Sequence, residues 1–207
     1  MLDTLLAQGL LPDPVLRFGI RRLLRQRSRE CWRGDTARRQ QRTRDFVASM
    51  KAGPIAVSTQ ESREQHYEVP TDFYRLCLGP HLKYSSGYWE RGTKGLGQAE
   101  ESMLALTAER ALISDGDKVL ELGCGWGSLT LFLAARFPKA LITGVSHSRT
   151  QREHILSEAK ARKLKNVRIL TQDMRHFGTK GRFDRVVSVE MFEHMRNWQT
   201  LMAKVHD

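Results

Sequence analysis

The sequence has no apolar stretch long enough to cross a membrane and only three cysteines among its 207 residues. A spanning helix needs about 20 consecutive apolar residues, and residues 1–11 are interrupted by polar residues and lack a basic start. The cysteines form no C-x-x-C pair that could clamp zinc or cycle a disulfide. We therefore expect a soluble protein that is not secreted, is cytoplasmic and carries no metal.

Two common nucleotide-binding motifs are also missing. No G-x-x-x-x-G-K-[ST] sequence is present, which excludes the usual nucleoside triphosphate loop. The glycine cluster at 123–127 has the pattern G-x-G-x-G rather than G-x-G-x-x-G, and the next expected strand ends in Val145, Ser146 and His147 without an acid. A dinucleotide site needs that acid to bind the ribose, so NAD is disfavoured.

Positive charge is concentrated in one segment. The net charge is +11, and residues 17–44 alone carry +9 because they hold eleven arginines against two acidic residues. Apolar residues recur at helical spacing beside these arginines, namely Leu16, Ile20, Leu23 and Leu24. This pattern predicts an amphipathic basic helix.

A basic arm is attracted to phosphate, either of lipid headgroups or of nucleic acid. No aromatic residues are interleaved as a stacking platform and no nucleic-acid motif occurs, so nucleic acid is disfavoured as a partner. Two interpretations stay open: peripheral contact with an anionic membrane, and a solvated helix that packs on its own protein.

The pattern along the chain predicts a basic helical arm with a linker over residues 1–59 and a second domain over 60–207. Strands and helices then alternate, as expected for a doubly wound α/β fold whose parallel sheet binds ligands at the carboxyl ends of its strands. Strands are predicted at 118–122, 141–145, 167–171 and 183–189. Helices are predicted at 13–32, from there to about residue 50, in two short pieces within 61–78, and at 98–113, 128–137 and 150–163.

Six motifs occur in one order: 65–70, 73–74, 84–88, 123–127, 143–151 and 189–195. In this order they resemble the cyclopropane-fatty-acyl-phospholipid synthases, the mycolic acid cyclopropane synthases and, most closely, the coclaurine N-methyltransferases. The resemblance covers residues 61–207 and implies a Rossmann-like class I methyltransferase sheet. That family's sheet has seven strands and four are expected here, so the resemblance also implies a C-terminally truncated domain.

The resemblance implies S-adenosylmethionine as the cofactor, and it assigns a part of the cofactor to each matching residue. It places Glu121, Tyr84 and Ser85 at the methionine end, Gly123, Gly125 and Gly127 in the cofactor loop, Ser146 and His147 near the adenosine, Gln151 at the ribose, and Asp173 at the adenine amino group. A glutamine amide can replace the missing ribose-binding carboxylate. For Asp173 the alternative is a helix N-cap, which aspartate favours.

The predicted catalytic residues, Glu190, Glu193 and His194, follow the fourth strand. Two carboxylates and an imidazole can orient a nucleophile, accept its proton or balance positive charge. The zinc motif H-x-x-E-H would need histidine where Glu190 stands, so a metal is disfavoured. A solvated, purely structural Glu-His pair is the alternative, since charged residues are common at strand ends.

The acceptor stays open between a small amine and an unsaturated acyl chain, as in lipid biosynthesis. In the cyclopropane synthases a bicarbonate, held by residues matching Glu193 and His194, takes up the proton. Those enzymes usually carry glycine where Glu190 stands and cysteine where Ser86 stands. Both differences count against a strict cyclopropane synthase, and Glu190 matches the amine methyltransferases. A further alternative is that the chain is an inactive, truncated fragment of such an enzyme.

Overall fold

The computed structural model describes residues 2–57 and 70–206, which divide into two compact units, 1–49 and 50–207. The first unit contains α1 (Leu2–Ala7), α2 (Asp13–Cys31) and most of α3 (Thr36–Ala52). Pro14 lies in the first turn of α2, where its missing N–H is not needed. The two predicted helices of the arm are confirmed, whereas α1 was not expected.

Helices α2 and α3 bury none of their residues. Large apolar side chains of α2 are exposed, namely Val15, Phe18, Ile20, Leu23 and Leu24. The connection between α2 and α3 is held by the Arg42 guanidinium, which donates to the Arg33 carbonyl at 2.6 Å. Within the described part of the chain, no helix is both long and apolar enough to cross a membrane.

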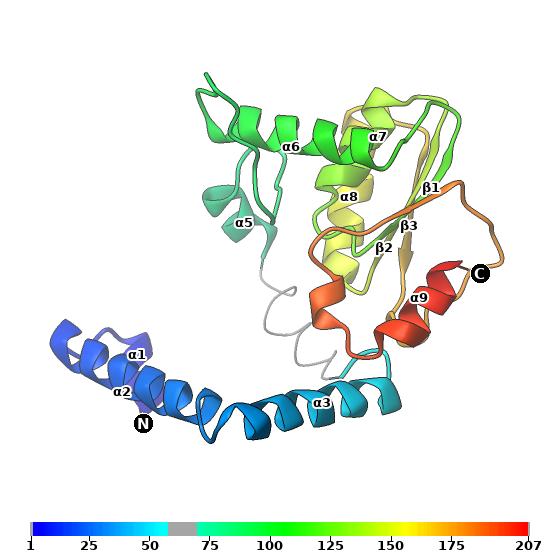
Figure 1. The fold of residues 1–207 in the computed structure, drawn as a ribbon. Coiled ribbons are helices and arrows are strands. Elements are labelled where there is room, and N and C mark those ends of the chain that lie inside the picture. The colour runs from blue at the N-terminus through cyan, green and yellow to red at the C-terminus, as the bar shows by residue number, and fades with distance from the viewer. Residues whose placement is uncertain (1, 58–69, 207) are drawn as a thin grey trace. The chain divides into compact units, whose positions relative to one another are not determined.

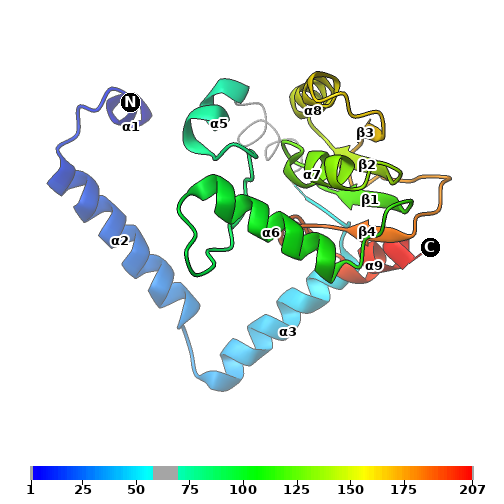
Figure 2. The same cartoon turned by 90° about the horizontal axis from the view of Figure 1, so that it is seen from above.

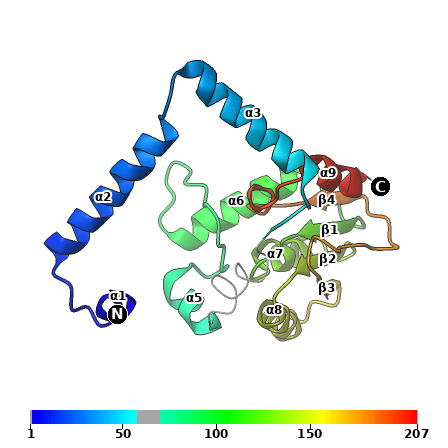
Figure 3. The same cartoon turned by 90° about the horizontal axis from the view of Figure 1, so that it is seen from below.

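The second unit is built on a parallel sheet with the strand order β3-β2-β1-β4 (Figures 2 and 3). Its strands are β1 (Lys118–Leu122), β2 (Leu141–Ser146), β3 (Val167–Thr171) and β4 (Arg185–Val187). Helices α7 (Ser128–Arg136) and α8 (Arg149–Ala161) connect the first three strands. Strand order reverses between β1 and β4, which confirms the predicted doubly wound arrangement.

Each face of the sheet has its own core. On one face Val119 and Ile142 pack with α7 and with α6 (Leu96–Arg110) (Figure 1). On the other face Leu120 and Val145 pack with Phe177 and with α9 (Trp198–His206). Because side chains alternate along a strand, Glu121 lies on the same face as Val119, towards α7.

Two segments differ from the prediction. The strand expected at 183–189 is confined to β4, because Val189 and Glu190 leave the sheet in a bend. The short 3-10 helix η1 (Phe192–His194), which was not predicted, follows. Of the helical pieces expected within 61–78, the described part contains α5 (Thr71–Cys77); residues 58–69, with most of the motif at 65–70, lie outside the described residues.

Residues 53–57, predicted as part of a linker, are packed in the second unit. Asn197 Nδ2 donates to the carbonyl oxygens of Lys51 and Gly53 at 2.8 and 2.9 Å. Ile55 and Ala56 are buried. The predicted domain boundary at residue 60 falls outside the described residues and stays a prediction.

Candidate functional site

A cavity of about 170 Å³ lies at the carboxyl ends of the strands and receives residues that follow all four of them. Most of the predicted site residues line it, namely Tyr84, Ser85, Glu121, Gly123, Gly125, Ser146, His147, Gln151, Asp173, Glu190 and His194. Gly127 and Glu193 are not part of its lining. The carboxyl edge of a parallel sheet, next to the point where strand order reverses, is where α/β folds bind ligands.

The glycines between β1 and α7 have different surroundings. All three have positive φ, but a Cβ at Gly125 would meet no atom within 4 Å, so this backbone faces open space in the cavity. A Cβ at Gly127 would lie 2.6 Å from Cγ1 of Ile155, so this glycine makes room for the packing of α8 against the N-terminus of α7. Only Gly125 therefore offers open access to its backbone.

Glu121 is a buried carboxylic acid at the end of β1. Its carboxylate accepts a hydrogen bond from the hydroxyl of Thr130 on α7. Burial raises the pKa of Glu121 to about 7, while the Thr130 hydrogen bonds and the charge of Lys83 act in the opposite direction. A cationic ligand beside this group would favour its ionised form.

The end of β2 holds a buried network of polar side chains. Ser146 Oγ donates to Gln151 Oε1 at 2.7 Å, and the Ser148 backbone N–H donates to Ser146 Oγ at 3.0 Å. Ser148 is the N-cap of α8, and its hydroxyl accepts from the backbone N–H of Gln151. The network fixes the Gln151 side chain at the cavity wall and engages its carbonyl oxygen.

Several buried polar atoms in the cavity wall have no hydrogen-bond partner among the described residues. They are Trp126 Nε1, Ser128 Oγ, Gln151 Nε2 and Gln172 Oε1. Buried polar groups are nearly always hydrogen-bonded in native proteins, so the cavity offers donors and acceptors to a polar ligand. Of these four residues, sequence reasoning assigned a role only to Gln151: Trp126 lies within the glycine motif at 123–127 but was given no role, and Ser128 and Gln172 lie in no motif.

Asp173 lines the cavity just after β3, but its carboxylate is engaged by a neighbour. It forms an ion pair with Arg175 Nη2 at 2.8 Å and accepts from the Arg175 backbone N–H at 2.8 Å. No helix begins here among the described residues, and residues 174–176 form a turn. Asp173 therefore caps a turn, which is close to the capping alternative, and its adenine contact stays a prediction.

The predicted catalytic residues follow β4. Glu190 has φ +50°, in the left-handed region that non-glycine residues rarely adopt. Such strained backbone is concentrated at functional sites. All three residues are exposed, but Glu190 and His194 line the cavity together whereas Glu193 lies outside its lining.

The segment before α6 contributes a buried lysine that the sequence analysis did not identify. Lys83 is 6% exposed and lines the cavity, and its ammonium donates to Ser85 Oγ. Its position next to Tyr84 and Ser85 was the only signal in the sequence. Lysine is rarely buried, so composition favours a solvated side chain there.

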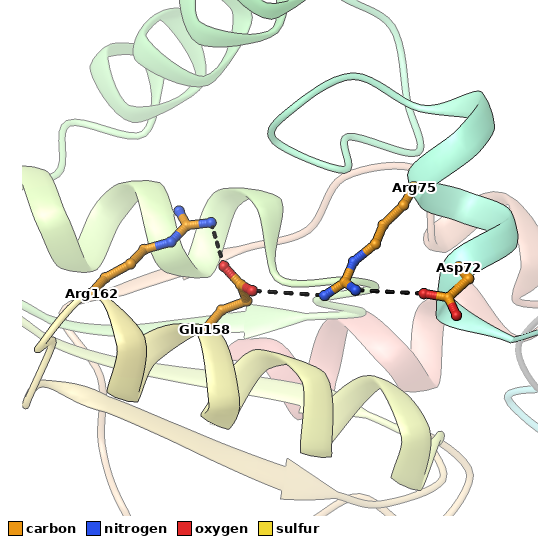
Figure 4. A network of polar contacts seen from close by, with 4 residues as sticks. All are labelled: Asp72, Arg75, Glu158 and Arg162. Carbon is orange, nitrogen blue, oxygen red and sulfur yellow. Dashed lines mark hydrogen bonds and ion pairs between the residues drawn. The ribbon is translucent and has the colours of Figure 1, made fainter.

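The α5 helix, which carries Tyr74, is attached to α8 beside this cavity. Arg75 of α5 approaches Glu158 of α8 at 3.9 Å, and Glu158 also pairs with Arg162 at 2.8 Å (Figure 4). The buried Tyr74 ring lies 4.8 Å from the ring of Trp126, centroid to centroid. These contacts place an aromatic cluster against the glycine loop.

Comparison with known proteins identifies the family. A sequence profile described as mycolic acid cyclopropane synthetase matches residues 56–207. The chain belongs to this family. It is 37% identical to (S)-coclaurine N-methyltransferase of Papaver somniferum over 199 residues, which is 96% of this chain and 57% of that protein. The cyclopropane-fatty-acyl-phospholipid synthase of Escherichia coli K12 is 33% identical over 144 residues, which is 69% of this chain and 36% of that enzyme.

Solved structures of the family give the same result. A coclaurine N-methyltransferase bound to N-methylheliamine and SAH matches with a TM-score of 0.84 at 33% identity, covering 99% of this chain and 59% of that one. A cyclopropane synthase of Mycobacterium tuberculosis matches with a TM-score of 0.60 at 26% identity, covering 67% of this chain and 48% of that one. The predicted Rossmann-like methyltransferase fold and the resemblance to the coclaurine enzymes are confirmed. The chain spans little more than half the length of the coclaurine enzymes.

Proposed function

We propose that this chain binds S-adenosylmethionine and belongs to an enzyme that transfers the cofactor's methyl group to an amine. The observation that supports this most strongly is the position of Glu190, a carboxylate with left-handed backbone in the wall of the same cavity as the glycine loop. Amine N-methyltransferases are among the family members to which the chain is similar. An amine acceptor would also give the Glu190 carboxylate a cationic product to stabilise, which an alkene would not.

The residues of the cavity fit the cofactor. Two carboxylates in its wall, those of Glu121 and Glu190, suit a ligand that carries a sulfonium and an ammonium group, whereas the third, that of Asp173, is paired with Arg175. Gln151 Nε2 is a buried donor without a described partner, as a ribose hydroxyl requires. Gly125 leaves the backbone open at the start of α7. Tyr84 and Ser85 in the wall provide hydroxyl groups for the amino-acid end.

When bound, the cofactor would supply an electrophilic methyl group. The chain's own residues then have two tasks. The first is to hold donor and acceptor in line in a cavity that excludes water. The second is to manage the proton that the amine loses: His194 in the cavity wall can accept it, and Glu190 can balance the charge of the ammonium product.

An unsaturated acyl chain is the second candidate acceptor, since the chain is also similar to cyclopropane synthases. In that reaction Glu193 and His194 would hold a bicarbonate that takes the proton. Glu193 lies outside the cavity lining, which gives this alternative less support. An amine acceptor would bind from solution, whereas an acyl chain would bind from a membrane surface.

The test combines binding and transfer. Calorimetric titration with S-adenosylhomocysteine is expected to show one site per chain. Transfer from labelled cofactor is then measured to a panel of secondary amines and to vesicles of unsaturated phospholipid, for the parent and for Glu190→Gly. Labelled amines from the parent and a loss in Glu190→Gly are expected.

The other results each exclude one part of the proposal. Labelled lipid alone from the parent, lost in Glu190→Gly, would assign the chain to the acyl-chain branch. Binding without transfer to either acceptor would show an inactive cofactor-binding chain. No binding at all would refute the cofactor assignment.

A further inference from the structure

Lys83 is the only lysine or arginine in the cavity wall among the residues that the structure describes. It lies in the segment before α6, and its ammonium donates to Ser85 Oγ. A buried ammonium group is costly unless an anion compensates it. The position of Lys83 therefore requires an electrostatic explanation.

The carboxylates of the second unit provide only part of that compensation. Three of them act on Lys83 electrostatically, in the order Glu190, Glu100 and Glu121, but none of them forms a direct ion pair with it. Burial is the larger effect and lowers the pKa of the Lys83 ammonium. An ammonium has three donors, and Ser85 is its one hydrogen-bond acceptor in the described part of the chain.

We infer that Lys83 binds the carboxylate at the amino-acid end of an S-adenosyl ligand. This inference rests on the proposed cofactor site. S-adenosylmethionine is cationic at two positions and anionic at one, and the wall has the complementary composition: the carboxylates of Glu121 and Glu190 and the ammonium of Lys83, with Asp173 already paired with Arg175. Ser85, next to Lys83, lies where family resemblance expects the methionine end. Lys83 is thus a ligand-binding residue, with Ser85 as the hydroxyl that positions its ammonium.

The alternative role is that Lys83 only neutralises Glu121 and Glu190 and so supports the cavity. The two roles predict different responses to the ligand. A carboxylate-binding lysine affects only ligands that carry the carboxylate. A supporting lysine affects every ligand of the cavity to a similar degree.

The experiment titrates three ligands by calorimetry: S-adenosylhomocysteine, its decarboxylated analogue, and 5′-methylthioadenosine, which lacks the whole amino-acid end. The proteins are the parent, Lys83→Met and the control Lys94→Met, which removes an exposed lysine on the same connection outside the cavity lining. In Lys83→Met the affinity for S-adenosylhomocysteine is expected to fall about 10- to 100-fold, as for a lost charged hydrogen bond. Affinities for the other two ligands are expected to stay within about twofold of the parent. The control should match the parent for all three.

Three results would overturn the inference. The first is equal binding of S-adenosylhomocysteine by the parent and Lys83→Met. The second is an equal loss for all three ligands in a folded Lys83→Met. The third needs no variant: a parent that binds the decarboxylated analogue as tightly as S-adenosylhomocysteine has no carboxylate site. A parent that binds none of the ligands would instead refute the proposed function.

Discussion

Ser146 Oγ donates a hydrogen bond to Gln151 Oε1 across 2.7 Å, and both side chains are buried. This contact determines which end of the glutamine amide is available, because the carbonyl oxygen is engaged and Nε2 is left as a donor at the cavity wall. Gln151 therefore presents a donor, whereas the carboxylate common in dinucleotide sites presents an acceptor. A ribose hydroxyl can satisfy either group.

Ser146→Ala should weaken binding at the ribose while preserving the cavity. Without the hydroxyl, the Gln151 amide can turn, and the Ser148 N–H loses its acceptor. We expect the affinity for both S-adenosylhomocysteine and 5′-methylthioadenosine to fall about 3- to 10-fold, because both contain the ribose. Ser157→Ala, on the exposed side of α8, is the control. Unchanged affinity in Ser146→Ala would show that Gln151 does not bind the ribose.

Gly125→Asp should abolish ligand binding at a smaller cost to the fold than a substitution at Gly127, because the φ of +51° at Gly125 lies in the left-handed region that aspartate can adopt. Its side chain would enter open cavity space and place a negative charge beside the existing carboxylates. Gly127→Ala should instead destabilise the fold and affect ligand binding less. Its Cβ would lie 2.6 Å from Cγ1 of Ile155, and its backbone has φ +83°. We expect a loss of about 1–3 kcal/mol in the free energy of unfolding for Gly127→Ala. Chemical denaturation and calorimetry measure the two effects, and similar profiles for both variants would contradict the distinction.

Glu121→Gln should stabilise the chain above neutral pH. The folded pKa of Glu121 is raised from 4.5 to about 7, so the folded state binds more protons than the unfolded state between these values. The free energy of unfolding of the parent should therefore fall as pH rises from 4.5 to 7, and then level off. Glu121→Gln removes this fall and should gain up to about 3 kcal/mol at pH 8.

The same substitution should weaken ligand binding, because the glutamine amide cannot pair with a cationic ligand. Denaturant titrations at pH 5 and pH 8 provide the stability test, and calorimetry provides the binding test. An identical pH slope in the parent and in Glu121→Gln would show that Glu121 is not the titrating group.

Local patterns predict the strands well where turns flank them and poorly where the chain leaves the sheet. The bounds of β1 and β3 agree with the prediction, because turn residues flank both strands, although β1 contains Lys118 and Glu121 and β3 contains Arg168. The last predicted strand is too long by four residues, two at each end, since 183–189 contracts to Arg185–Val187. The cause at its carboxyl end is the bend into the left-handed Glu190, which hydrophobicity does not indicate.

Prediction of the residues that line the cavity is limited in the same way. Motifs predicted residues of the loops after β1, β2 and β4, because glycine spacing and clustered carboxylates are visible in the sequence. They could not predict Lys83, because its burial depends on how the segment before α6 packs over the sheet. They also could not separate Gly125 from Gly127, since the nearest obstacle to a Cβ at Gly127 is Ile155 of a different helix.

The ion pairs around Glu158, which link α5 to α8, should contribute modestly to the free energy of unfolding. This contribution should depend on pH. The Arg162 hydrogen bond lowers the pKa of Glu158, so its contribution is present above the ordinary pKa of 4.5 and is lost as pH falls through the lowered folded pKa. Glu158→Gln should cost no more than about 1 kcal/mol at pH 7, because these ion pairs are partly exposed. Thermal melts compared with Glu153→Gln, on the exposed surface of α8, measure this. A larger cost would indicate that α5 needs this anchor to fold.

The basic helices of the first unit should bind anionic membranes if their exposed apolar residues insert beside the arginines. Vesicles with phosphatidylserine are expected to co-sediment the chain, with binding that weakens steeply as salt rises. Deletion of residues 13–44 should remove this binding. Equal sedimentation with neutral vesicles, or none with either kind, would leave α2 a role in packing on protein.

The hydrogen bonds from Asn197 to Lys51 and Gly53 hold in place the segment just before residues that line the cavity, ahead of the domain that the motifs define. Ala56 and Val57 line that cavity, and the family match begins at residue 56. A protease that cuts within 34–49 would release the basic helices and leave this wall in place. The same boundary applies to replacement of the arm by recombination during evolution. A break before Met50 would exchange the arm alone, whereas a break after Met50 would remove part of the pocket.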